Sequence, residues 1–204
     1  MATITSWATL KTEIAAWLNR SDLTDVIPGL TQLGEARIYR DLRVRQMETA
    51  LSSAIASGVV AVPSGYLGMK YAYLDGTPVQ RLERKDAEWI YQNYPTRAAE
   101  SKPFFFAREA GNFIFGPYPD SAYTMKGVYW KKLDPLSDSN TSNWLITDAP
   151  DLILFASLCE AAPYLGDDAR LALWESKYAA LGQAIQRQDS AEDVSGGPIA
   201  MVAR

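Results

Sequence analysis

Three groups of aspartates are the residues of this chain with the clearest capacity for metal-dependent chemistry. They are Asp120, which follows a proline, the pair at 167–168, and Asp22 with Asp25 around a turn. A nuclease-like carboxylate site on Asp120 would need another acid one residue before a lysine, and the segment 129–132 has none. Turns and helix caps account for the remaining aspartates. We therefore predict no metal site and no catalytic or cofactor-binding residue.

The composition removes the common routes to catalysis. The chain contains no histidine, so it lacks the usual general base, the commonest zinc ligand and the Ser-His or Cys-His pairs. Phosphate-binding loops, dinucleotide-binding glycine motifs and the Gly-x-Ser-x-Gly elbow are also missing from the sequence. The single cysteine, Cys159, lies in an apolar stretch and is expected to be a small buried hydrophobic residue. We predict that the protein is not an enzyme.

A ladder of arginines is the first candidate binding feature. Its members end the second predicted helix and follow it at short intervals: Arg37, Arg40, Arg43 and Arg45. One interpretation is a solvated helix face, with Asp41 four residues from both Arg37 and Arg45. The other is salt bridging to a neighbouring subunit or to a larger partner. The sequence leaves both open.

An aromatic run is the second candidate. Phe104, Phe105 and Phe106 would point alternately to the two faces of one strand, so at least one should lie opposite the core. Either a second layer covers that face, or the aromatics form a protein–protein surface. Stacking on a sugar or on single-stranded nucleic acid is a more remote alternative.

The third candidate is the C-terminal tail. Residues 189–194 are acidic and polar, and Ser195–Pro198 contains two glycines and a proline. An apolar segment with one cation follows: Ile199, Ala200, Met201, Val202, Ala203 and Arg204. The tail is either an unstructured terminus or a docking peptide for a neighbouring protein, and we favour docking.

Hydrophobic spacing predicts a helical hairpin at the start of the chain. Thr5 or Ser6 can cap a first helix that ends near Asn19. Its apolar residues recur at steps of three and four: Trp7, Leu10, Ile14 and Trp17. A second helix is expected to begin at Pro28, a residue that suits the first helical turn.

The middle of the chain predicts short strands. Tyr66–Leu74 and Thr77–Leu82 flank Asp75-Gly76, a strong hairpin signal. Residues 104–107 and 112–115 form a second expected hairpin, and 84–93 a short helix between the two. Five or six antiparallel strands would make a small sheet or sandwich.

Two more helices are expected toward the C-terminus. Residues 152–159 are apolar nearly all round, which predicts a central buried helix that Pro163 and Gly166 end. The last helix has a bundle seam at steps of three and four: Leu171, Trp174, Tyr178, Leu181 and Ile185.

These elements predict an α+β fold. The N- and C-terminal hairpins would form one four-helix bundle from residues 1–46 and 137–188. Residues 47–136 would be an inserted antiparallel β-rich subdomain, and residues 189–204 an extended docking tail.

Composition sets further bounds. The 204 residues are 48% hydrophobic and 22% charged, which is ordinary globular usage, and no apolar run approaches the ~18 residues of a membrane span. The first residues lack a signal-peptide pattern, so we expect synthesis in a cytoplasm and no membrane partner. A net charge of −4 disfavours tight duplex binding but permits an acidic wall along which DNA slides.

The N-terminal motifs resemble those of tailed-bacteriophage head-to-tail adaptor proteins. The resemblance rests on Trp17–Arg20, Asp22–Asp25, Ile27-Pro28, Glu35–Ile38 and Arg40–Arg43, taken in order and spacing. It covers about a fifth of the chain at motif level. The helix–β–helix layout and the tail extend it loosely over the remainder.

The resemblance implies a structural virion protein at the head-to-tail junction, assembled in the host cytoplasm. Such a protein forms a homo-oligomeric ring, a dodecamer in this family, that binds the portal ring and continues the DNA channel. Double-stranded DNA would pass through the lumen without sequence-specific binding. The tail would contact the portal, and the β-rich insertion would contact tail or nozzle proteins.

The sequence leaves two other functions open. Another virion part, such as a nozzle, tail-tube or neck-completion protein, would share the lack of catalytic residues but would not bind the portal. A carbohydrate- or cell-surface-binding module would instead require the insertion's aromatics to form an exposed stacking platform.

Overall fold

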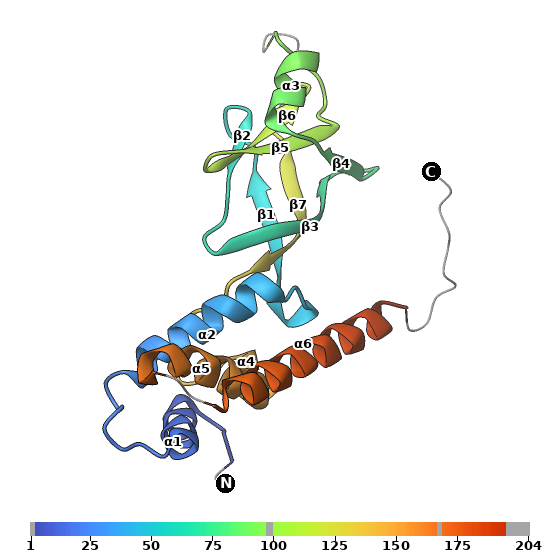
Figure 1. Ribbon diagram of the computed structural model, residues 1–204. Coiled ribbons are helices and arrows are strands. Elements are labelled where there is room, and N and C mark those ends of the chain that lie inside the picture. The colour runs from blue at the N-terminus through green and yellow to red at the C-terminus, as the bar shows by residue number, and fades with distance from the viewer. Residues whose placement is uncertain (1–2, 97–99, 167–168, 195–204) are drawn as a thin grey trace. The chain divides into compact units, whose positions relative to one another are not determined.

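A computed structural model describes residues 3–96, 100–166 and 169–194 of the protein (Figure 1). The chain divides into two compact units. A helical unit comprises Met1–Gln46 and Leu133–Arg204, and a β unit comprises Met47–Lys132.

The predicted four-helix bundle with an inserted antiparallel subdomain is wrong. The described residues form an α+β fold with six α-helices and one seven-stranded, nearly closed, barrel-like sheet. The helical unit holds five of those helices: α1 (Trp7–Leu18), α2 (Ile27–Asp41), α4 (Trp144–Thr147), α5 (Pro150–Leu165) and α6 (Leu171–Val194).

Helix α5 is the centre of the helical unit. Its residues from Leu152 to Ala162 are buried on nearly every side, with Phe155 and Glu160 as the partly exposed positions. Helices α1, α2, α4 and α6 all pack against it. A helix that is apolar all round must be surrounded, which a bundle of four equivalent helices does not achieve. Pro163 lies inside the last turn rather than ending the helix, and Gly166 follows the end.

Helix α6 explains the rest of the discrepancy. Of its predicted seam, only Trp174 and Tyr178 are buried, whereas Leu171, Leu181 and Ile185 are partly exposed. The apolar contact therefore covers the first half of this 24-residue helix. The second half does not extend a bundle core.

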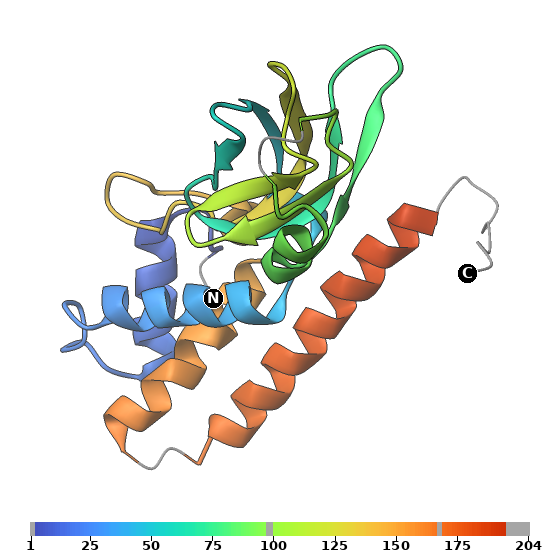
Figure 2. The same ribbon diagram turned by 90° about the horizontal axis from the view of Figure 1, so that it is seen from above.

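The contact between α2 and α5 depends on a glycine. Figure 2 shows α2 crossing α5, with α6 beside α5. A Cβ on Gly34 would lie 3.0 Å from the Ser157 backbone nitrogen and 3.2 Å from the Ala156 carbonyl carbon. The two helices pack at a distance that only glycine permits without a shift of backbone.

Local sequence signals set where the first two helices begin and end. Ser6 caps α1, where its hydroxyl accepts from the Thr9 N–H at 3.3 Å and its own N–H donates to Thr9 Oγ1 at 2.9 Å. Asn19 ends the helix in the left-handed region, with φ of 53°. Helix α2 begins at Ile27, one residue before Pro28.

The β unit contains one helix, α3 (Ala87–Asn93), and seven strands. These are β1 (Glu48–Ala54), β2 (Val59–Ala61), β3 (Tyr66–Leu74), β4 (Gln80–Arg84), β5 (Phe105–Glu109), β6 (Asn112–Gly116) and β7 (Thr124–Lys131). A short 3-10 turn, Arg45–Met47, precedes β1. The strand order is β1-β7-β3-β4-β5-β6-β2.

Both predicted hairpins are confirmed, but the all-antiparallel pairing is not. Strands β3 and β4 pair antiparallel, as do β5 and β6. Strands β4 and β5 pair parallel, through Glu83 with Phe105 and Arg84 with Phe106. Parallel neighbours need a crossover connection, and the segment that contains α3 supplies it.

The sheet curls around a single core. Every strand contributes at least one buried residue to it: Leu51, Val60, Ala72, Leu74, Leu82, Phe106, Phe113, Phe115, Met125 and Tyr129. Burial of one face from all seven strands favours closure over an open sheet. Helix α3 covers part of the outer face, where Ile90 packs with Ala107 and Ile114.

We predict that Gly34→Ala destabilises the protein by about 1–3 kcal/mol, because the new methyl group meets backbone atoms of α5. Gly29→Ala on the same helix is the matched control, since nothing lies within 4 Å of its Cβ position. The control should be neutral or up to about 1 kcal/mol more stable. Urea denaturation measures both, and equal effects at the two glycines would contradict the proposed close packing.

Candidate assembly surfaces

The Arg37 side chain contacts other residues of the helical unit. Its guanidinium donates to Glu175 Oε1 at 2.9 Å and lies 3.6 Å from Glu160 Oε1. The guanidinium carbon is 4.5 Å from the centre of the Tyr178 ring. The hydroxyl of Tyr178 donates to Asp41 Oδ2 at 2.7 Å. Arg37 therefore joins α2 to α5 and α6, and Asp41 is the hydrogen-bond acceptor for Tyr178.

The other arginines of the ladder diverge. The guanidinium of Arg43 donates to the carbonyls of Tyr39 and Leu42, at the end of α2. Arg45 faces α6: its backbone N–H donates to Asp189 Oδ1 at 2.9 Å, and its guanidinium lies 2.5 Å from Glu192 Oε2.

Arg40 differs from its neighbours. Its side chain is exposed, and it forms no ion pair within the residues that the structure describes. Arg43 likewise pairs with no carboxylate among those residues, but it is partly buried and donates to two carbonyls, so Arg40 is the most exposed unpaired cation of the four.

The three phenylalanines of the aromatic run have three environments. Phe106 is buried in the sheet core, at 3% exposure. Phe105 points to the outer face, where its ring centre is 4.9 Å from that of Trp89 of α3. Phe104 precedes β5 and is 44% exposed. The second layer that covers the strand is α3, and it leaves Phe104 exposed.

Residues 189–194, expected in the tail, continue α6 in the structure. The segment Ile199–Arg204 lies outside the described residues, as does the aspartate pair at 167–168. Of the other candidate aspartates, Asp22 and Asp120 have local partners. Asp22 is paired with Arg20 at 2.6 Å, which lowers the pKa of Asp22 to about 2, and Asp120 accepts from Tyr123.

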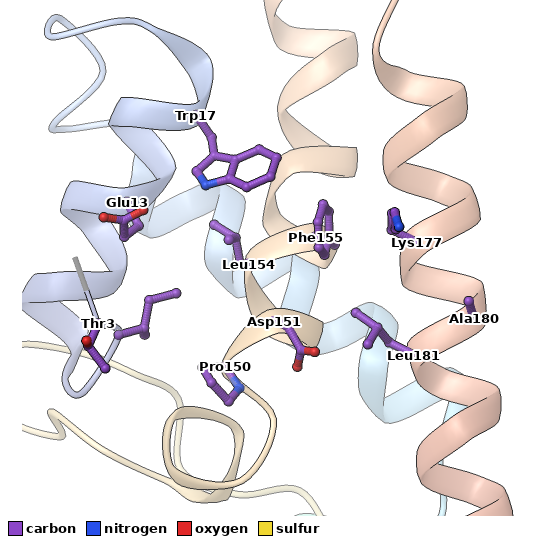
Figure 3. A pocket seen from close by; sticks show the side chains of 11 residues that line it. Thr3, Glu13, Trp17, Pro150, Asp151, Leu154, Phe155, Lys177, Ala180 and Leu181 are labelled. Atoms are coloured by element: carbon purple, nitrogen blue, oxygen red, sulfur yellow. The ribbon is translucent and has the colours of Figure 1, made fainter. Parts of the chain in front are cut away.

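The helical unit also contains an apolar groove that the sequence did not predict. It has a volume of about 710 Å³ and lies between α1 and α6, with α5 as its floor (Figure 3). Its lining residues are Thr3, Ile4, Glu13, Trp17, Pro150, Asp151, Leu154, Phe155, Lys177, Ala180 and Leu181. Trp17 contacts Phe155 edge to face, with ring centres 5.4 Å apart.

The groove was missed because Trp17 fits the apolar face of α1 by spacing. In the structure that side chain is only partly buried, as are Ile4, Phe155 and Leu181. Partly exposed aromatic and aliphatic side chains gathered in one hollow are typical of an interaction site. The sequence signal was that the apolar stripe of α1 includes one more large side chain, Trp17, than the core buries.

Glu35 is a second residue whose role the sequence missed. It is 3% exposed, and its Oε1 accepts from the Leu136 N–H at 3.1 Å and from Asn143 Nδ2 at 3.5 Å. The carboxylate thus ties the segment after β7 to α2. The signal was its position: Glu35 lies four residues after Thr31 and three before Ile38, both buried.

The described ranges contain no group of three or more histidines, cysteines, aspartates or glutamates that could hold a metal ion. In the same ranges, no helix is both long and apolar enough to cross a membrane.

Both units carry exposed large apolar side chains, among them Leu33 of the helical unit and Phe104 of the β unit, which is typical of proteins that bind other proteins. The family model of the SU10 adaptor protein matches residues 5–201, nearly the whole chain. The protein therefore belongs to the SU10 adaptor family, a phage head-to-tail adaptor family, and the resemblance drawn from the N-terminal motifs is confirmed. No curated protein matches the chain.

The Glu35 contact makes stability depend on pH. Burial raises the pKa of Glu35 above its usual 4.5, against the opposing effect of the Leu136 and Asn143 hydrogen bonds. The folded state then keeps a proton that the unfolded state has lost, so unfolding free energy falls as pH rises through this window. Relative to Glu35→Gln, the wild type should lose stability over the pH range that begins near the usual carboxyl pKa of 4.5 and rises through the raised pKa of the folded state.

Urea titrations of both proteins across that range measure the difference. Gln keeps an oxygen for the two donors but cannot ionise, so it is the matched control. A difference in unfolding free energy that does not change with pH would contradict the assignment.

Proposed function

We propose that the protein is a phage head-to-tail adaptor that forms a ring, binds the portal, extends the DNA channel and provides the platform for tail attachment. The observation that carries the proposal is the family match over residues 5–201. The absence of a metal-ligand cluster in the described residues is compatible with a structural role. The ring is proposed to be dodecameric and to act at the head-to-tail junction of the virion.

The charge of the chain supports passage of DNA without capture. A net charge of −4 gives a ring of twelve copies a strongly acidic total. Such a wall repels phosphate within a Debye length of about 8–10 Å and does not hold the duplex. Double-stranded DNA is therefore proposed to pass through the lumen without specific contacts.

The proposed portal contact is the apolar segment Ile199–Arg204, which follows α6. Arg45 contacts Asp189 and Glu192 in the last turns of α6, so those turns lie beside the segment after α2. These contacts give the C-terminal segment a defined starting point on the helical unit. Arg40, exposed on α2, is the arginine proposed for a salt bridge to another subunit or to the portal.

We predict that a chain ending at Val194 stays folded but no longer binds the portal. This boundary keeps Asp189 and Glu192, so the partners of Arg45 are retained. Co-sedimentation with the cognate portal ring measures binding, and thermal melts measure folding. The matched control keeps the chain length but replaces residues 199–204 with glycine and serine, and it should fail in the same way.

Undiminished portal binding by the shortened chain would reject the docking segment. Absence of portal binding by the full-length protein would reject the adaptor role itself and favour a more distal tail component.

The proposed tail-protein surface centres on Phe104. We predict that Phe104→Ser leaves stability within about 0.5 kcal/mol, because the side chain is 44% exposed. Binding of the cognate tail or nozzle protein should weaken about tenfold, the loss of a typical aromatic anchor. Val79→Ser, at 59% exposure in the same unit, is the control. Titration of the tail protein onto portal-bound adaptor measures the effect, and equal affinity of the two variants would place the interface elsewhere.

A further inference from the structure

The groove between α1 and α6 presents an apolar hollow with charges at its rim. Trp17, Phe155 and Leu181 line it from three different helices (Figure 3). Glu13 and Asp151 contribute carboxylates, and Lys177 contributes a cation from α6. Asp151 and Lys177 are exposed, whereas Glu13 is 6% exposed. The groove thus suits an apolar side chain accompanied by a basic residue.

A matching ridge lies on α2. Gly29, Leu33, Ala36 and Arg40 follow one another at steps of four, three and four, so they form one stripe along the helix. Leu33 is 53% exposed, Arg40 is exposed, and nothing lies within 4 Å of a Cβ placed on Gly29. The stripe therefore carries one protruding apolar side chain between two small residues, followed by a cation.

Groove and stripe lie on different sides of the helical unit. Gly34 of α2 packs against Ser157 of α5, and Phe155, which lines the groove, is two residues or roughly 200° around α5 from Ser157. On α2, Ala36 of the stripe is two residues, or roughly 200°, from Gly34, and Leu33 is one residue, or roughly 100°, from it, so the stripe points away from α5. Figure 3 agrees, because the ribbon of α2 passes behind α5 while the lining side chains stand in front.

We propose that the groove of one copy receives the α2 stripe of a second copy, with Leu33 inserted between Trp17, Phe155 and Leu181. Arg40 lies seven residues, or about 10 Å, along α2 from Leu33 and carries the cation toward the Asp151 side of the rim. The inference rests on the ring assembly proposed above and names the two surfaces that build it.

The second copy is the occupant that the arrangement favours. Two different, complementary surfaces on separate sides of one unit are what a head-to-tail interface requires, and such an interface closes into a ring when its rotation closes. A self-complementary dimer would instead place the same patch on both partners. The free cation of Arg40 and the exposed carboxylate of Asp151 complement one another in charge.

Cross-linking between two separately made variants tests the contact. Leu33→Cys is mixed with Ala180→Cys, and a short bis-maleimide is added, both to the free protein at high concentration and to the portal-bound complex. We expect a covalent dimer linking positions 33 and 180. The native Cys159 gives little background, because it is 3% exposed and burial raises the pKa of its thiol to about 11.

Val79→Cys mixed with Ala180→Cys is the control, since Val79 is exposed but belongs to neither surface. A yield for 33–180 no higher than this control, in both the free protein and the complex, overturns the proposal. A dominant link between two copies of Leu33→Cys also overturns it, in favour of a symmetric contact. A link from Met201→Cys to Ala180→Cys in place of 33–180 would assign the groove to the C-terminal segment.

A complementation experiment separates the interface from the adaptor role. Leu33→Asp and Ala180→Asp should each abolish self-association, because each removes one of the two surfaces. Their mixture should form dimers and nothing larger, since only one intact groove and one intact stripe can meet, and sedimentation velocity measures this. Failure of portal binding with the 33–180 link intact rejects the adaptor role alone, and the reverse result rejects only this interface.

Discussion

The burial of α5 is the constraint on which the helical unit depends. A helix that is apolar on nearly every side cannot sit at the surface, so other helices must surround it. Gly34 lets α2 approach the backbone of α5, and Arg37 links that pair to Glu175 of α6. With α2 fixed on one side, α1 and α6 are left to flank the other, and they leave the hollow floored by Phe155. The groove is thus a consequence of how α5 is covered.

Charged residues near this core are used mainly to position elements. Glu35 holds the segment after β7, Arg37 joins three helices, and the exposed Arg45 contacts the end of α6. Removing one partner of a partly buried ion pair leaves the other charge uncompensated, so Arg37 and its carboxylate partners hold one another in place. Arginines that are regularly spaced in the sequence therefore have different roles. Arg40 differs from the others in that the fold leaves its side chain exposed, which its sequence position did not indicate.

Local signals in the sequence were sufficient to predict individual helices and hairpins. The cap at Ser6, the hairpin at Asp75-Gly76 and the apolar run before Cys159 each depend on neighbouring residues, and the structure contains all three. Arrangements that depend on distant residues were not predictable. The parallel pairing of Glu83 with Phe105 and the closeness of Gly34 to Ser157 involve residues far apart in the chain. Spacing placed Trp17 on an apolar face but could not show that its contacts would be incomplete.

An assembly protein must keep apolar surface exposed until its partner arrives, which conflicts with its own solubility. This chain limits the conflict by dividing that surface into small pieces. Leu33 is the one large apolar side chain between Gly29 and Ala36 on its stripe. Phe104 is exposed, whereas α3 covers its neighbour Phe105. The aromatic side chains of the groove line a hollow rather than a flat surface. Each piece alone is smaller than the roughly 800 Å² that each partner buries in a standard protein–protein interface. Stable attachment then requires several pieces to be engaged together, which the proposed ring on its portal would provide and a chance encounter would not.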